Sequence, residues 1–511
     1  MRKKGRILSL LLSCLLVLTF FASCNENASD KESTGATLES SETSVTTEGV
    51  QIEASDSETE TVGETEIEYV PEIAKTNYEE QLYMQVYGDD SYMRFIWAEE
   101  GNSDLLSEAV FNRQVRLQEH IGVELVGITH GTFDNYSESF KQSIKNKDGS
   151  IDVLIPNSYM PVANLIDGGY ARNLDTLDYL NFDADYWKLD YMDSISLVDR
   201  HYLGYSDFNT MKTYVFTFNK DMLDRYMDQL DETLYESVYN YRWTLDKMIS
   251  VANLVYIDNT ADGKTADDTF GISGIQWSPF ITFLHASNIK LVEQDESGAY
   301  KVSVYNELNS YKTSYLVDKL KALAESDCAW FRYRIESTPV VELHTGRALM
   351  NLNATVNIDD LLQYEVRFGI LPYPMYDELQ KDVGYMSLNH DGYIMVASYL
   401  TNEKMVGQSL ELLSYYSKDV QIAVHEKWLG KQAADAPDDN KMLDIIWDGI
   451  CPDFGLTYST ITYSLDENLY LMPKLTQPGT TKNLASYVKS YEKEANSSIS
   501  KYLKKIARLE E

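Results

Sequence analysis

The stretch that most constrains the fold is residues 214–223, which read YVFTFNKDML. It is a short apolar strand that runs straight into a charged helix start. Two later landmarks are residues 346–353 (GRALMNLN) and 384–398 (GYMSLNHDGYIMVAS). We interpret the three as strands at which the chain passes between two lobes. A cleft between two such lobes can close on a ligand by hinge motion.

The first 23 residues have the features of a secretion signal rather than of a folded segment. The basic residues Arg2, Lys3, Lys4 and Arg6 precede an apolar run, residues 7–21, that is short for a membrane span. Two small residues follow, and Cys24 comes directly after them. This order resembles the lipobox of bacterial lipoproteins, although that pattern prefers Leu at position 21, where this chain has Phe. We therefore expect a lipid anchor on Cys24, with an ordinary secretory signal as the alternative.

Residues 24–75 are expected to form a disordered, acidic tether. They are rich in Ser, Thr and Glu, and they contain too few large apolar residues to offset the entropy of an ordered chain. The whole chain is acidic as well, with 44 basic and 80 acidic residues and a formal net charge of −36. This charge disfavours binding to nucleic acid or to an anionic membrane surface.

The remaining residues are numerous enough for two lobes and a large core. We assign residues 76–215 to the first part of lobe 1 and residues 216–345 to the main part of lobe 2. Residues 346–511 are expected to return through the hinge and to complete both lobes with a helical C-terminal part. Cys328 and Cys451 allow at most one disulfide in addition to a lipidated Cys24, and the sequence leaves open whether they pair.

Strand and helix patterns alternate through the first lobe. Strands are predicted at residues 92–97, 123–128 and 151–155. A helix that begins after its cap Asp104 and ends at Gly122 is predicted between the first two strands, and a second helix is predicted over residues 136–145. Such alternation predicts a parallel sheet whose ligands lie beyond the carboxyl ends of the strands, here residues 97–102 and 156–159. Further helices are predicted after Thr244 and over residues 316–324, 403–415 and 485–507.

Five motifs in order resemble those of the extracellular solute-binding proteins of ABC sugar importers, the group typified by the maltose-binding protein. They are FNKD at 218–221, WTLD at 243–246, GRALM at 346–350, FGILPYP at 368–374, and a Gly392 crossing that leads to a helix at Asn402. The resemblance covers nearly the whole mature chain. Two features depart from the family pattern: residues 351–355 lack the usual Trp after the Met strand, and Val406-Gly407 replaces the usual Ala.

The resemblance implies a two-lobe periplasmic-binding-protein-like α/β fold, with a mostly parallel sheet in each lobe and hinge strands between them. It implies a monomeric binder on the extracellular side of the cell membrane that performs no chemistry and needs no cofactor. The implied partners are a carbohydrate, the permease subunits of an ABC transporter, and the membrane through the lipid on Cys24. A surface glycan receptor without transport, or a glycoside hydrolase, is the alternative.

Sugars present hydroxyl groups and flat C–H faces, so a sugar site needs aromatic platforms and polar side chains that donate and accept. Candidates at the expected strand ends, loops and crossings are Trp97, Glu99, Asn157, Tyr159, Asp207, Asn209, Trp277, Asn353 and Asp391. Core packing is the alternative role for the two tryptophans, and turn hydrogen bonds are the alternative for the three residues Asp207, Asn209 and Asp391.

Residues 258–268, DNTADGKTADD, resemble the start of a calcium loop but have Thr269 where that loop has Glu, so a solvated loop is the main interpretation. No metallopeptidase, nucleophile-elbow or phosphate-loop motif is present in the sequence. The adjacent pair Glu99 and Glu100 is poorly suited to hold two carboxyl groups across a sugar ring. The sequence therefore favours a binding protein over an enzyme.

Overall fold

The computed structural model describes most of the chain after residue 68. The described ranges are 69–87, 93–101, 104–130, 133–157, 160–209, 213–276, 278–332, 340–355, 358–388, 392–429, 437–462 and 471–509. All of them belong to one compact unit, Ile67–Glu511. Within this described part, no helix has the length and apolar character needed to cross a membrane. Two candidate contacts in the first lobe and hinge (Tyr159 and Asp391) and one in the second (Trp277) lie outside the described residues.

The first sheet has the strand order β13-β3-β1-β2. Strands β1 (Glu80–Tyr87), β2 (Val123–His130) and β3 (Val153–Ile155) are parallel, and β13 (Met395–Val396) joins β3 antiparallel. The connecting helices are α3 (Leu105–Ile121) and α4 (Phe133–Asn146). The predicted parallel β-α-β-α-β arrangement is therefore confirmed. Asp104 caps α3 through its side chain, and Gly122 ends the helix in the left-handed conformation, as the sequence predicts.

The predicted first strand at residues 92–97 is wrong. The first strand is β1, which pairs with β2 along its whole length, whereas Met93–Ile96 form a turn closed by hydrogen bonds to the Met93 carbonyl. Phe95 is buried in that turn, so its apolar character serves packing rather than a strand. In β1 the apolar residues Leu82, Met84 and Val86 are buried on one face, and Gln85 is buried on the other.

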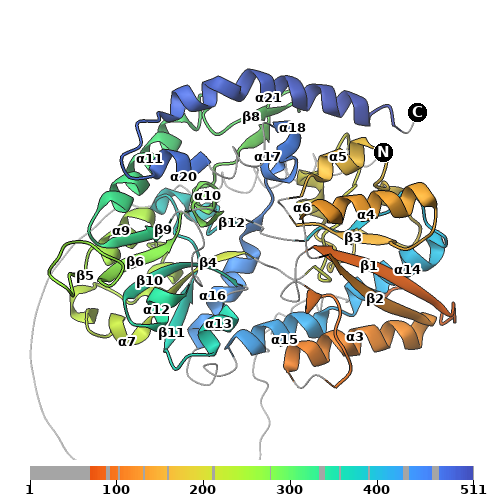
Figure 1. The fold of residues 1–511 in the computed structure, drawn as a ribbon, viewed down its shortest axis with the longest axis horizontal. Helices are drawn as coiled ribbons and strands as arrows, with labels where there is room; N and C mark the ends of the chain where they lie inside the picture. The colour runs from red at the N-terminus through yellow and green to blue at the C-terminus, as the bar shows by residue number, and fades with distance from the viewer. Residues whose placement is uncertain are drawn as a thin grey trace, which may run out of the picture. The chain divides into compact units, whose positions relative to one another are not determined.

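The second sheet has the order β11-β4-β10-β6-β5, with β9 paired to β6 (Figure 1). Its strands are β4 (Tyr214–Asn219), β5 (Tyr256–Ile257), β6 (Thr269–Ile275), β9 (Ala329–Arg332), β10 (Ala348–Ala354) and β11 (Phe368–Leu371). Strand β10 lies between β4 and β6 along its length. Residues 348–353, within the segment predicted as a crossing, therefore lie inside the second sheet. Every residue of β4 and β10 is buried. Both strands lie in the interior of the sheet, and helices cover both of its faces.

Helices cover both faces of the second sheet. Val215, Phe368 and Ile370 on one face belong to an apolar cluster with residues of α12, α13, α15 and α16. Phe216 on the other face packs edge-on against Trp243, Phe283 and Tyr373. The helices on and near this sheet are α7 (Lys220–Leu223), α8 (Leu234–Tyr239), α9 (Leu245–Ala252), α10 (Ser278–Ala286), α11 (Ser310–Glu325), α12 (Val341–His344), α13 (Ile358–Leu362) and α16 (Pro437–Asp448).

The rest of the chain packs around the first sheet and joins it to the second. These elements are α5 (Val162–Asp167), α6 (Leu189–Ser194), α14 (Glu403–Tyr415), α15 (Lys418–Leu429), α17 (Phe454–Thr457), α18 (Ser459–Thr462), α20 (Leu471–Thr476) and α21 (Leu484–Ile506). Helix α21 contacts α5 beside the first sheet and α11 beside the second (Figure 1). Two short ribbons complete the fold: β7 (Val292–Gln294) with β8 (Tyr300–Val302), and β12 (Ser387–Leu388) with β14 (Ile450–Cys451).

Two expectations left open by the sequence concern cysteines and calcium. Cys328 and Cys451 are both free and buried, so they do not pair with each other in this structure. In the 258–268 loop, the carboxylate of Asp258 accepts hydrogen bonds from the backbone amides of Thr260, Ala261 and Gly263. Among the described residues, no group of three or more His, Cys, Asp or Glu side chains is arranged to hold a metal ion.

Candidate functional site

Two parts of the chain contact each other between the sheets, and we call them the connectors. The first consists of residues 204–209 and Thr213, and the second consists of residues 387–388 and 392–394. On the side of the first sheet, Gly204 and Ile394 exchange backbone hydrogen bonds of 2.8 Å. The side chain of Asn209 donates from Nδ2 to the carbonyl of Gly392 at 2.9 Å. These contacts attach both connectors to each other where they leave the first sheet.

A second set of contacts joins the connectors where they enter the second sheet. The hydroxyl of Thr213 lies 2.6 Å from Ser387 Oγ and donates to the Leu388 carbonyl at 2.7 Å. The Ser387 hydroxyl in turn donates to the carbonyl of Tyr214 at 3.0 Å. Thr355, at the end of β10, accepts the Thr213 amide on its Oγ1 at 3.1 Å. Short hydroxyl side chains thus satisfy buried backbone groups where the strand ladders end.

A cavity of about 460 Å³ lies beside the first connector. It is lined by Asp207, Lys418, Gln421, Ile422, His425, Glu426 and Asn440. Asp207 comes from the segment that leaves the first sheet, Asn440 comes from α16, which packs on β11 of the second sheet, and the others come from α15. Its volume falls within the range of about 300–1,000 Å³ that is common for small-molecule sites. The cavity therefore has walls from elements of both lobes.

The cavity combines opposite charges with neutral amides. Asp207 pairs with Lys188 at 2.8 Å, and burial raises the pKa of its carboxyl group even though the nearby ammonium acts to lower it. Gln421 donates from Nε2 to the backbone carbonyl of Asp207 at 2.6 Å, which attaches the backbone at Asp207 to α15. Burial lowers the pKa of His425 although Asp444 acts to raise it, and the lowered pKa favours the neutral ring, which can both donate and accept. The side chains together offer donors and acceptors with little net charge.

The predicted contact residues have different fates in the structure. Of the nine, Asp207 lines the cavity. Asn209 is buried and holds the connectors together, with its Oδ1 accepting the Ser206 amide at 3.1 Å. Asn157 is buried just after β3, beside the Pro156 carbonyl that accepts the Tyr393 amide.

Three other predicted residues lie away from the cavity. Trp97 is half-buried against the large core and does not end a strand, so the reason for choosing it is wrong. Glu99 is exposed in the same segment. Asn353 is buried inside β10, where its Oδ1 accepts the Ala354 amide at 2.9 Å and its Nδ2 has no hydrogen-bond partner.

The α15 residues of the cavity were not predicted. Lys418, Gln421, Ile422 and His425 follow the i, i+3, i+4, i+7 spacing of one helix face. That spacing marks a single face but does not show whether it meets solvent or a second lobe. Only the packing of α15 against both α3 and α16 shows that this face lines a cavity between the two lobes.

Comparison with known proteins gives the fold. No protein-family model matches the chain, and neither does any curated protein. The GacH receptor of Streptomyces glaucescens, solved unliganded and in complex with acarbose, matches at 15% identity and a TM-score of 0.52, over 84% of this chain and 99% of that one. An ABC substrate-binding protein of Listeria monocytogenes, solved in complex with cycloalternan, matches at 12% identity and a TM-score of 0.51, over 82% and 99%.

The chain has the two-lobe fold of these binding proteins. The predicted fold class is therefore confirmed, and the likeness extends over nearly the whole length of both relatives. In this periplasmic-binding-protein fold, the connectors join the two lobes, and the cavity at Asp207 lies between elements of the two.

Proposed function

We propose that this protein captures a carbohydrate between its lobes and delivers it to the permease of an ABC transporter. The observation that carries the proposal is the fold, shared over nearly full length with two binding proteins solved with acarbose and with cycloalternan. The cavity between the lobes supports the same conclusion, because its walls come from both sides of the connectors.

The polar lining of the cavity suits a ligand rich in hydroxyl groups. A sugar hydroxyl both donates and accepts hydrogen bonds. Gln421, Asn440 and a neutral His425 each have a donor group and an acceptor group, so they can bind it in either way. Asp207 adds a charged acceptor, and a hydrogen bond to a charged group is worth about 1.5–3 kcal/mol. A fully anionic or cationic ligand would meet both Lys418 and Glu426 and would gain little from either.

Capture by closure requires contacts that differ between the open and closed arrangements. A ligand that touches Asp207 and Asn440 at once would favour the closed arrangement, since these residues belong to different lobes. The connectors are joined by hydrogen bonds from Asn209 to Gly392 and from Thr213 to Leu388, and we place the rotation between the lobes at these contacts. The protein would bind as a monomer and perform no chemistry on the sugar.

We also propose that Cys24 carries a lipid and that the chain from Cys24 to residue 68 acts as a tether on the extracellular side of the cell membrane. The predicted tether extended to residue 75, but residues 69–75 belong to the folded unit, where Ile73 is buried in the core. A diacylglyceryl group gives stable anchoring where a single acyl chain does not. The tether would let the two lobes reach substrate in solution and then the permease at the membrane.

The proposal is tested by calorimetric titration of the full chain with maltotriose, mannotriose and a cyclic tetrasaccharide. We expect at least one sugar to bind, and we expect D207N and N440A each to weaken that binding about tenfold or more, as the loss of a directed hydrogen bond implies. D183N serves as the matched control, because Asp183 is exposed on the first lobe and does not line the cavity. Binding that is absent for every sugar, or release of smaller sugars during incubation, would contradict a binding-protein function.

A further inference from the structure

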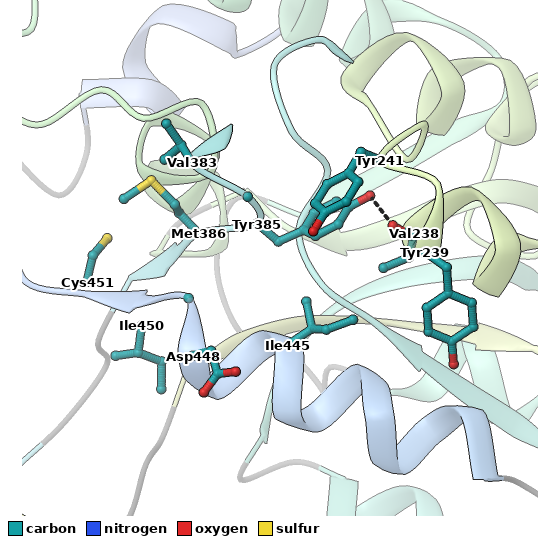
Figure 2. Close-up of a pocket in the computed structure, with 12 residues that line it drawn as sticks. Val238, Tyr239, Tyr241, Val383, Tyr385, Met386, Ile445, Asp448, Ile450 and Cys451 are labelled. Carbon is teal, nitrogen blue, oxygen red and sulfur yellow. Dashed lines mark hydrogen bonds between the residues drawn. The ribbon is translucent and has the colours of Figure 1, made fainter. Parts of the chain in front are cut away.

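A second cavity, of about 390 Å³, lies on the second lobe (Figure 2). Its walls come from the end of α8, from the segment before β12, and from the junction of α16 and β14. Helices α8 and α16 both pack on β11 of the second sheet. The cavity shares no lining residue with the one at Asp207, so it is a separate site.

Tyr241 at the edge of this cavity occupies a backbone position that usually belongs to glycine. Its φ is +56°, and it follows the last residues of α8. The Tyr241 amide donates to Val238 O at 3.0 Å, and the Arg242 amide donates to Ser237 O at 2.7 Å. These two bonds form a Schellman motif, in which the left-handed residue is usually glycine because an L side chain is strained there. Helix termination alone would favour glycine at this position, but the chain has a tyrosine there.

The ring of Tyr241 is held in a fixed orientation. It lies parallel to the ring of Tyr385, with an angle of 7° between the planes and 6.1 Å between the ring centroids, an offset stack. Tyr385 is itself buried, and its hydroxyl donates to the Val238 carbonyl at 3.0 Å (Figure 2). Tyr241 nevertheless stays 44% exposed, so much of its ring remains open to a ligand.

The other walls give the cavity an apolar floor and a polar edge. Val383 and Met386 lie on the segment before β12, and Ile445 lies on α16, as Figure 2 shows. The carboxylate of Asp448 is exposed at the end of the same helix. A sugar ring has flat C–H groups on its face and hydroxyl groups at its rim. The exposed aromatic ring and the apolar side chains suit the C–H face, and the carboxylate can accept a hydrogen bond from a hydroxyl group.

We infer that this cavity is a second carbohydrate site, in which one pyranose ring stacks on Tyr241 and donates a hydroxyl to Asp448. The choice of ligand class rests on the proposed function, whereas the site itself rests on the cavity and on the orientation of Tyr241. The cavity volume suits a single ring or the end of a longer chain. The site would hold part of an oligosaccharide, or a second one, outside the space between the lobes.

The experiment uses the methyl group of Met386 as a local reporter. The full chain is prepared with carbon-13 methyl methionine, the Met386 signal is assigned with M386L, and methyl α-glucopyranoside and methyl α-mannopyranoside are titrated to 100 mM. Sorbitol, which has the hydroxyls but no ring face, is the control ligand. We expect a saturable shift of the Met386 signal with a pyranoside and none with sorbitol.

Variants separate the site from helix stability and from lobe closure. Y241G should weaken the pyranoside response at least tenfold while the melting temperature stays level or rises, because glycine relieves the backbone strain. Y179G is the matched control, since Tyr179 is also exposed with a positive φ of 78° but lies on the first lobe and outside this cavity. D448N should weaken the response several-fold, and D207N should leave it unchanged.

Three outcomes would overturn the inference: a Met386 signal that no pyranoside moves, a response that survives Y241G, or a response that D207N abolishes, which would assign it to lobe closure. If calorimetry still shows an oligosaccharide bound in the wild type and weakened by D207N, only the second site fails. If no sugar binds in either assay, the proposed function fails with it.

Discussion

Asn209 donates a hydrogen bond from its side-chain amide to the backbone carbonyl of Gly392 at 2.9 Å, and this contact joins two chain segments far apart in sequence. Asn209 is buried, and its Oδ1 also accepts the Ser206 amide. One amide side chain therefore fixes a turn in the first connector and attaches it to the second.

N209A removes both hydrogen bonds and leaves the Ser206 amide and the Gly392 carbonyl without these partners. We expect the free energy of unfolding to fall by about 1–3 kcal/mol, the usual cost of an unsatisfied buried group. N253A is the control, because Asn253 is exposed at the end of α9, and it should change stability by less than about 0.5 kcal/mol. Urea denaturation measures both, and equal effects for the two variants would show that the connector contact is unimportant.

The buried contact between His285 and Asp453 ties α10 to the start of α17, with Nε2 and Oδ2 2.9 Å apart and both side chains inaccessible to solvent. Burial acts to raise the pKa of Asp453, but the bonds from His285 and from the amides of Leu291 and Leu456 outweigh it, so the pKa lies below its usual value. A depressed carboxyl pKa contributes stability above the unfolded value of about 3.9, and this contribution is lost as the pH falls through the folded pKa.

D453N should therefore destabilise the protein at pH 7 by about 3–5 kcal/mol, because a charged partner is removed from a buried pair. The wild type should lose stability steeply below pH 4, and the variant should lose less over the same interval. Thermal melts from pH 7 to pH 3 measure the difference. Parallel wild-type and variant curves would contradict the role of this carboxylate.

The contribution of His201 to stability depends on pH in the opposite direction from that of Asp453. Burial acts to lower its pKa, but Asp175 at 2.8 Å and Asp193 at 3.1 Å raise it above the usual value. A raised histidine pKa contributes stability that is complete below the unfolded value of about 6.5 and is lost as the pH rises through the folded pKa. Both carboxylates are partly exposed, so solvent screening limits the contribution to less than about 1 kcal/mol.

We expect H201Q to lower the melting temperature at pH 6 and to have a smaller effect at pH 9. The measurement is a pair of thermal melts for each protein at the two pH values. A loss that is equal at both would assign the effect to packing against Phe182 rather than to charge.

Local signals in the sequence predicted helix ends well. Asp104, Thr244 and Gly122 act as the predicted caps, because capping depends on one side chain or one backbone angle within a single turn. The strand predicted at residues 92–97 was wrong because a short apolar run can be buried in a turn as readily as in a sheet, and only pairing with β2 decides between them.

The candidate site was harder to predict, for a related reason. Asp207 precedes a predicted crossing, and it lies at the cavity. Asn440 and His425 lie on helices that the sequence shows only as polar or amphipathic, and their meeting depends on how α15 and α16 pack. Residue Tyr241 offered no sequence signal, because a positive φ at a tyrosine is a property of the folded helix end.

The lipid anchor is a separate prediction that depends only on the N-terminal sequence. C24A should shift the protein from the membrane fraction to the soluble fraction, since the lipid is the expected attachment. Cell fractionation and immunoblotting measure the shift, with C328A as the matched control, because Cys328 is buried in the folded unit. An unchanged membrane fraction for C24A would contradict the anchor.

The central claim is capture of a sugar by closure of two lobes, and small-angle scattering of the full chain with and without the best sugar from calorimetry tests it most directly. The account predicts a smaller radius of gyration at saturating sugar, with no such change in D207N at the same concentration. Saturating sugar that binds the wild type but leaves its radius of gyration unchanged would contradict closure about the connectors.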